Sequence, residues 1–100
     1  MSKKQKWISI EVKNKVNVGE IKILPLKDAG KLQAIFTVSF FDGAISIPGF
    51  KLIDGRGLSF IATPSKEYSK GEYCPTAFFD KGVYDFLTSE KLIEAIKEEL

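Results

Sequence analysis

Residues 50–65 read Phe-Lys-Leu-Ile-Asp-Gly-Arg-Gly-Leu-Ser-Phe-Ile-Ala-Thr-Pro-Ser, and this stretch decides the fold. It holds two apolar runs that are joined by Gly55-Arg56-Gly57 and closed by Pro64. Two short apolar runs around a glycine-rich turn are typical of a β-hairpin, because glycine adopts the backbone angles that tight turns need. We therefore predict a hairpin whose tip carries Arg56 and whose exit loop is basic.

The chain before this hairpin also alternates between apolar and polar residues, which is the spacing of β-strands. Residues 7–13 and 16–24 give two such runs, separated by a turn at Asn14-Lys15. Residues 32–41 give the clearest run, and its second face is also partly apolar. We expect a central strand here that is covered on both sides or paired with another subunit.

Two dipeptides mark a turn and a break in these strands. Asp42-Gly43 is typical of a two-residue hairpin, because a type I′ turn needs positive φ at both central residues. Pro48-Gly49 interrupts the return strand, residues 44–53, and a proline cannot donate to a sheet ladder. We expect a bulge or bend at Pro48-Gly49.

The end of the chain has the pattern of an amphipathic helix. Ser89 or Thr88 can cap its start. Apolar residues then recur at helical spacing, at Leu92, Ile93, Ile96 and Leu100. A polar loop over residues 64–72 and a short edge strand over residues 73–79 precede it. We predict an α+β protein, a twisted antiparallel β-sheet with a C-terminal amphipathic helix packed on it.

Length and composition fit a single globular domain over residues 1–100. The chain is 44% apolar and 28% charged, close to the average for folded proteins. We expect a disordered tail at residues 1–6. No apolar stretch approaches the roughly 20 residues of a membrane span, so no membrane association is expected. The lone Cys74 fits a reducing compartment, and we expect a cytoplasmic protein in which Cys74 is buried.

The chain contains no histidine. This removes the commonest general base, the histidine-dependent nucleophile pairs and nearly every ordinary zinc or iron site. Carboxylate pairs such as Asp54 with Asp80 are better explained as surface residues, because no spacing fixes them at a set distance. We predict that the protein is not an enzyme and has no catalytic residues, no metal, no cofactor and no small-molecule substrate.

Charge is distributed unevenly along the chain, although the net charge is only +2. Residues 1–31 hold eight lysines against three carboxylates, a balance of +5, whereas residues 82–100 carry −3. A polyanion should therefore approach the sheet side or the N-terminal arm. An imbalance of this size is equally consistent with charges that only solvate a small domain.

Two segments have the residue types that bind nucleic acid. The glycines around Arg56 could cradle a phosphate, but a tight hairpin turn explains them better. The basic loop with Lys66 and Lys70 also carries Tyr68, and aromatic residues among lysines can stack bases while the cations neutralise phosphates. From the residues alone, a solvated loop with its tyrosines packed on the sheet edge is the favoured interpretation.

The hairpin region resembles a known family of bacterial proteins. The resemblance rests on three motifs, Leu52-Ile53-Asp54-Gly55, Gly57-Leu58-Ser59-Phe60-Ile61-Ala62-Thr63-Pro64-Ser65-Lys66 and Gly71-Glu72-Tyr73. Their order and spelling are similar to those of the sporulation and septation regulators of the SpoVG type. The resemblance covers roughly residues 16–80, so residues 7–15 look like an N-terminal extension.

This resemblance implies a function and reverses the preference for a plain solvated loop. It implies a small regulator that binds DNA or RNA through backbone contacts, and a homodimer formed through sheet edges. It implies phosphate contacts at Lys51, Arg56, Lys66 and Lys70, with Tyr68 as a stacking group. The alternative is a protein-interaction or scaffold module that uses a sheet edge and an aromatic surface made by Phe40, Phe41, Phe78 and Phe79.

Overall fold

The computed structural model describes residues 7–26, 30–55 and 57–100. The expected disordered tail, residues 1–6, lies outside the described residues, as does Arg56. The described strands are β1 (Ile8–Glu11), β2 (Val18–Pro25), β3 (Leu32–Phe40), β4 (Ile45–Gly55), β5 (Leu58–Ala62), β6 (Ser65–Ser69) and β7 (Glu72–Pro75). The described helices are α1 (Lys81–Leu87) and α2 (Glu90–Lys97).

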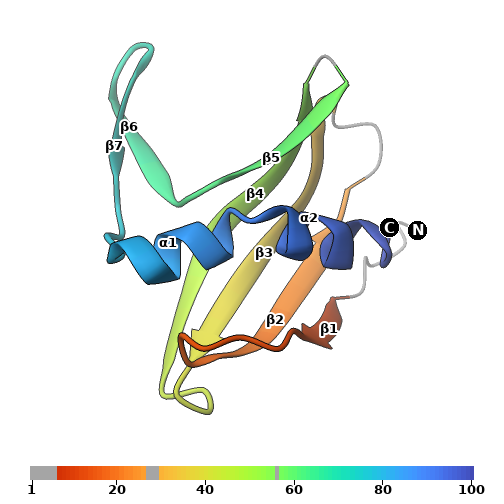
Figure 1. Cartoon of the computed structure of the whole chain (residues 1–100). Coiled ribbons are helices and arrows are strands. Elements are labelled where there is room, and N and C mark those ends of the chain that lie inside the picture. The colour runs from red at the N-terminus through yellow and green to blue at the C-terminus, as the bar shows by residue number, and fades with distance from the viewer. Residues whose placement is uncertain (1–6, 27–29, 56) are drawn as a thin grey trace, which may run out of the picture.

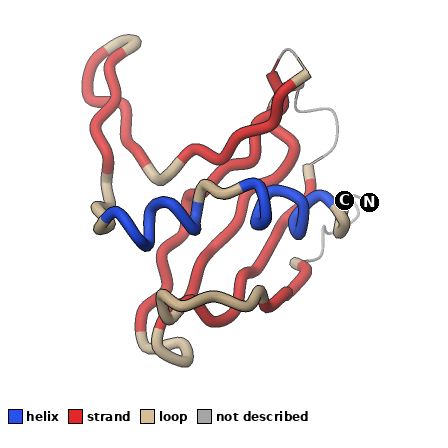
Figure 2. Tube along the Cα trace, viewed as in Figure 1, coloured by secondary structure: helices blue, strands red, loops and turns tan. Residues whose placement is uncertain are grey.

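Strands β1 to β5 form one antiparallel sheet in the order of the sequence (Figure 1). Strands β6 and β7 form a separate two-stranded hairpin, which we call the ribbon. Both helices cross the same face of the large sheet, as Figure 2 shows. The α+β architecture predicted from the order of strands and helix is confirmed. No helix in the described ranges is long and apolar enough to span a membrane.

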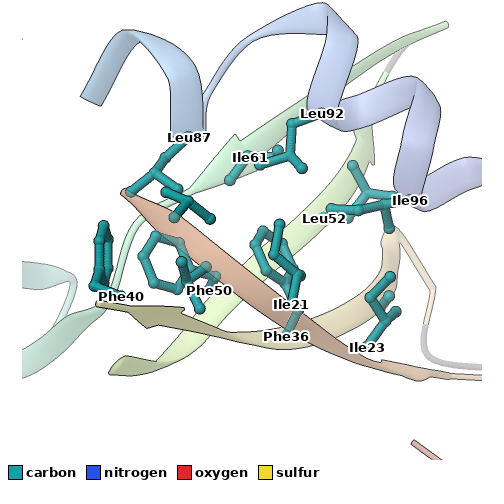
Figure 3. Close-up of a cluster of buried hydrophobic side chains, with 13 residues drawn as sticks. Ile21, Ile23, Phe36, Phe40, Phe50, Leu52, Ile61, Leu87, Leu92 and Ile96 are labelled. Carbon is teal, nitrogen blue, oxygen red and sulfur yellow. The ribbon is translucent and has the colours of Figure 1, made fainter. Parts of the chain in front are cut away.

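The core lies between the sheet and the helices because alternate residues of each strand point toward the helices. Figure 3 shows these side chains from β2, β3, β4 and β5 meeting Leu87, Leu92 and Ile96. Leu92 and Ile96 are fully buried, as their spacing predicted. The prediction for Leu100 is wrong: this residue lies beyond the end of α2 and is 47% exposed.

Each helix begins at a side-chain cap. Ser89 accepts a hydrogen bond from the Leu92 backbone N–H at 3.3 Å, which confirms Ser89 as the cap of α2. Asp80 accepts from the Val83 N–H at 2.9 Å and starts α1. The two caps leave a short connection at Thr88-Ser89 between the helices.

The β3–β4 turn differs from its prediction by one residue. Four residues, 41–44, separate the strands, so the hairpin is not the expected two-residue hairpin at Asp42-Gly43. The Gly43 N–H bonds to the Phe40 carbonyl at 3.1 Å, with φ of 53° at Phe41 and 55° at Asp42. Positive φ at these two central residues gives the primed type of turn, centred on Phe41-Asp42.

The bulge predicted at Pro48-Gly49 is confirmed. The pairing between β3 and β4 shifts between Phe36 and Val38, opposite this dipeptide, and Gly49 has a φ of 97°. An extra residue on one strand bends it and increases its twist. In β4 this bend brings Gly49 against Pro64, at the point where the chain leaves β5 for the ribbon.

Candidate nucleic-acid interface

The ribbon replaces the polar loop that was expected over residues 64–72. Its strands pair Lys66 with Cys74 and Glu67 with Tyr73, and they turn at Lys70-Gly71. Gly71 has a φ of 80°, and its N–H donates to the Glu67 carboxylate at 2.8 Å. The Tyr68 hydroxyl donates to Glu72 at 2.9 Å. These two hydrogen bonds close the tip, so a hairpin with a bulge between Glu67 and Ser69 forms although neither of its faces is apolar.

The ribbon projects from the body of the molecule. Figure 1 shows it rising beyond the start of α1, away from the sheet. Every residue of β6 and β7 is exposed. At its base, the Thr76 N–H bonds to the Pro64 carbonyl at 3.0 Å, and Pro64 itself is buried. The ribbon is therefore anchored only at its base, with both faces open to a partner.

Two of the predicted cations lie on this ribbon with the predicted aromatic group. Lys66 and Tyr68 lie on β6, with Tyr68 at a bulge in the pairing with β7, and Lys70 lies in the turn. Tyr68 is 67% exposed. Neither lysine forms an ion pair within the described part of the chain. The two carboxylates of the ribbon, Glu67 and Glu72, are held by the hydrogen bonds of the tip, whereas the ammonium groups remain available.

The structure separates Lys51 from these residues. Lys51 lies in β4, between Ile35 of β3 and Ala62 of β5. Its neighbour Leu52 is fully buried under the helices, so Lys51 points to the opposite face of the sheet. Arg56, the fifth predicted site residue, lies outside the described residues. The predicted contacts therefore fall on two surfaces, the ribbon and the uncovered side of the sheet.

We call this uncovered side the open face; its side chains are the strand residues that point away from the helices. It carries Trp7, Ser9, Lys22, Leu24, Ile35, Thr37, Lys51 and Phe60, which alternate with buried core residues. Of these, the site prediction included only Lys51. The strand alternation already placed Trp7 and Ser9 together, but the partners of Lys22 and Phe60 depend on strand register, which the sequence does not specify.

The aromatic surface of the alternative interaction hypothesis is divided. Phe40 is buried and stacks on Phe79 with ring centroids 6.4 Å apart. Phe41 and Phe78 are 57% and 83% exposed. Only two of the four rings are therefore offered to a partner, while the other two belong to the core.

No group of three or more carboxylates and cysteines among the described residues could hold a metal ion. A hydrogen bond from Lys81 to Asp85, aided by their opposite charges, raises the pKa of Lys81 on the solvent side of α1.

Cys74 was expected to be buried, but it is exposed on β7. The expectation was wrong because the segment that carries Cys74 leaves the body of the protein.

Comparison with known proteins adds a family to this geometry. A sequence model of SpoVG proteins matches residues 16–81. The chain belongs to the SpoVG family. Within the fold, the SpoVG match runs from the residues before β2 to the first residue of α1, so it includes both Lys51 and the whole ribbon. The SpoVG resemblance seen in the hairpin motifs is confirmed.

Two relatives show how far the SpoVG likeness extends. The protein of Caldanaerobacter subterraneus subsp. tengcongensis named "Putative septation protein SpoVG" is 30% identical over 84 residues, which cover 84% of this chain and 87% of the relative. The protein of the same name from Clostridium perfringens is also 30% identical, over 84% of this chain and 88% of its own length. No solved structure gives a significant match.

Proposed function

We propose that this SpoVG protein is a small regulator that binds the backbone of DNA or RNA. The observation that carries the proposal is the ribbon, which holds Lys66, Lys70 and Tyr68 clear of the body on a fully exposed hairpin. Cations that project in this way reach phosphates without the cost of burying an unpaired charge.

The distribution of charge favours an approach from the ribbon and the open face. The outer side of α2 carries Glu90, Glu94 and Glu98, all exposed, and would repel a polyanion. Lys51 lies on the other side of the sheet, where it can meet a strand of nucleic acid that also touches the ribbon base. Contacts of this kind fix position on the backbone and read little sequence.

The test is the salt dependence of binding to one DNA and one RNA oligonucleotide, measured by gel shift at several salt concentrations. Removing Lys51, Lys66 and Lys70 together by substitution with alanine should weaken binding to different sequences about equally. It should also lower the slope of log affinity against log salt by about one unit for each lysine. A matched triple variant, Lys81→Ala, Lys91→Ala and Lys97→Ala, removes the same charge from the helices and should change the slope far less.

Equal effects of the two triple variants would contradict the assignment of these lysines as contacts. Absence of binding to any oligonucleotide at low salt, by a folded protein, would contradict nucleic-acid binding altogether. Circular dichroism of each variant checks that the fold is retained, which is expected because all six lysines are exposed.

A further inference from the structure

We infer that the open face of the sheet is a stacking platform for single-stranded nucleic acid. In this arrangement Trp7 and Phe60 stack on bases, and Lys22 and Lys51 neutralise the adjoining phosphates. The inference rests on the proposed function and deepens it, because it names the strand form of the ligand and a second contact surface besides the ribbon.

The register of the strands places these side chains across the sheet. Leu24 pairs with Ile35, Ile35 with Lys51, and Lys51 with Ala62. Trp7 directly precedes Ile8, the partner of Ile23, so it lies beside Leu24 at the β1 edge. Neighbouring strands are about 4.8 Å apart, so the row from β1 to β5 spans roughly 19 Å.

Apolar side chains of the open face remain in contact with solvent. Ile35 is only partly buried although it lies in the central strand, whereas its neighbours Ala34 and Phe36 are 0% and 1% exposed. Phe60 is 49% exposed, with its ring beside Gly55. Trp7 is also 49% exposed. Trp7 lies at the β1 end of the row, and Phe60 lies on β5 two residues from Ala62, which ends the row on the other side. These two half-exposed aromatic rings give flat apolar surfaces that suit the faces of bases.

The surface beside Trp7 is hollowed. A depression of about 420 Å³ is lined by Trp7, Ser9, Lys22 and Thr37. Its walls combine an aromatic ring, two hydroxyl groups and one ammonium group. Such a set can stack a base, hydrogen-bond its edge and pair with its phosphate.

Charge on the open face is complementary to a polyanion that follows this row. Lys51 lies in the row on β4, and Lys22 lies next to the row on β2; both are exposed, and the Lys22 ammonium is 3.9 Å from the Glu20 carboxylate. The acidic pair Glu11 and Glu20 lies further along β1 and β2, facing each other across the ladder. A phosphate backbone is therefore attracted to the row that contains Trp7 and is repelled from the Glu11 end.

The side chains of the open face make two other ligands less favourable there, a nucleic-acid duplex and a second copy of this chain. A duplex hides the faces of its bases, so the aromatic rings would gain nothing from it. A second copy packed on this face would bury Lys51 near the middle of an apolar row with no carboxylate opposite it in the described sheet, which is costly. Single-stranded nucleic acid satisfies the rings and the ammonium groups together.

Trp7 is the only tryptophan of the chain, so its fluorescence reports on this face alone. The experiment titrates the full chain with a twelve-residue oligothymidylate, an oligouridylate of the same length and a duplex of the same length, at low salt. Both single strands should quench the emission, because stacked bases quench indole, and the duplex should not. A difference between the thymidylate and uridylate curves shows which chemistry the face prefers.

Variants then separate this inference from the proposed function. Phe60→Ala should weaken single-strand binding about 5- to 150-fold, the effect of losing one stacking ring. Phe60→Tyr should retain most of the affinity. Tyr84→Ala removes an aromatic ring of similar exposure, 47%, from the helix side and is the matched control. Anisotropy of a labelled oligonucleotide measures the affinity of each variant.

The outcomes can be distinguished. Salt-dependent binding without quenching of Trp7 and without an effect of Phe60→Ala would overturn the stacking platform and leave the proposed function standing. Trp7 emission that changes with protein concentration alone, with a dimer lost in Phe60→Ala, would assign the face to a second copy and overturn the inference. No binding of any strand would overturn both.

Discussion

The backbone of Gly49 in β4 packs against the ring of Pro64, the residue that leads into the ribbon. A methyl group at Gly49 would lie 3.4 Å from Pro64 Cβ. The bulge in the sheet therefore lies against the base of the ribbon.

The first prediction concerns this contact. Gly49→Ala should lower the free energy of unfolding by about 1–3 kcal/mol, because φ is 97° there and side chains avoid such angles. Gly43→Ala should cost about the same, since its φ is 89° and nothing lies within 4 Å. Valine at the two sites should differ, because only at Gly49 would the added carbons displace Pro64. Urea unfolding measures all four variants, and equal costs for both valines would rule out a tight contact.

The second prediction concerns the helix face of the core. Leu92→Ala and Ile96→Ala should each cost about 2–5 kcal/mol, because both residues are fully buried and their truncation leaves a cavity. Leu100→Ala makes the same kind of change at a half-exposed site and should cost less than about 1 kcal/mol. Thermal or urea unfolding gives the comparison. A large cost at Leu100 would show that the end of the chain packs on the sheet.

The third prediction concerns the turn between β1 and β2. The Asn14 side chain donates to the carbonyls of Val12 and Val18, both at 2.8 Å. Its oxygen accepts from the N–H groups of Val16 and Val18 at 2.9 and 3.0 Å. Asn14→Ala should therefore cost about 1–3 kcal/mol, because four hydrogen bonds are lost and backbone groups remain unpaired.

The control for Asn14 is its neighbour. Lys15→Ala changes an exposed residue of the same turn and should stay within about 0.5 kcal/mol of the parent protein. Amide exchange of β1 adds a local readout, since loosening this turn should speed exchange in Ile8–Glu11 first. Unchanged exchange in Asn14→Ala would contradict the role of this side chain in fixing β1.

The fourth prediction is a dimer formed through sheet edges. Strands β1 and β5 are the outer strands of the described sheet, and each has a neighbour on only one side. The ribbon is a two-stranded hairpin without apolar cover, a form that is marginally stable alone in water. Edges of this kind favour pairing with a second copy. Sedimentation should show a dimer at micromolar concentration, and a monomer throughout the concentration range would rule it out.

The sheet and its core could be predicted because apolar and polar residues alternate along the strands, and the apolar ones are those that become buried. Between Leu32 and Phe40 every second residue is apolar, and four of these, Ala34, Phe36, Val38 and Phe40, lie in the core between sheet and helices. The exact turn at Phe41-Asp42 could not be predicted, because a phenylalanine with positive φ is uncommon and Asp-Gly is the stronger local signal.

The candidate site was only partly predictable for a different physical reason. The segments Ser65–Ser69 and Glu72–Pro75 have no buried face, so they lack the pattern that identifies strands. Hydrogen bonds at the tip and the anchor at Pro64 hold them instead. The open face was missed because Trp7 and Phe60 are far apart in sequence and become parts of one surface only through strand register.

The exposed Cys74 and the single Trp7 together provide two independent optical reporters. Cys74 is the only cysteine and lies on the ribbon, whereas Trp7 is the only tryptophan and lies on the open face. A thiol-reactive dye on Cys74 accepts energy from Trp7 without any engineered residue. Transfer efficiency would follow the angle of the ribbon relative to the sheet, while dye anisotropy and indole emission would separately record which of the two surfaces a ligand reaches first.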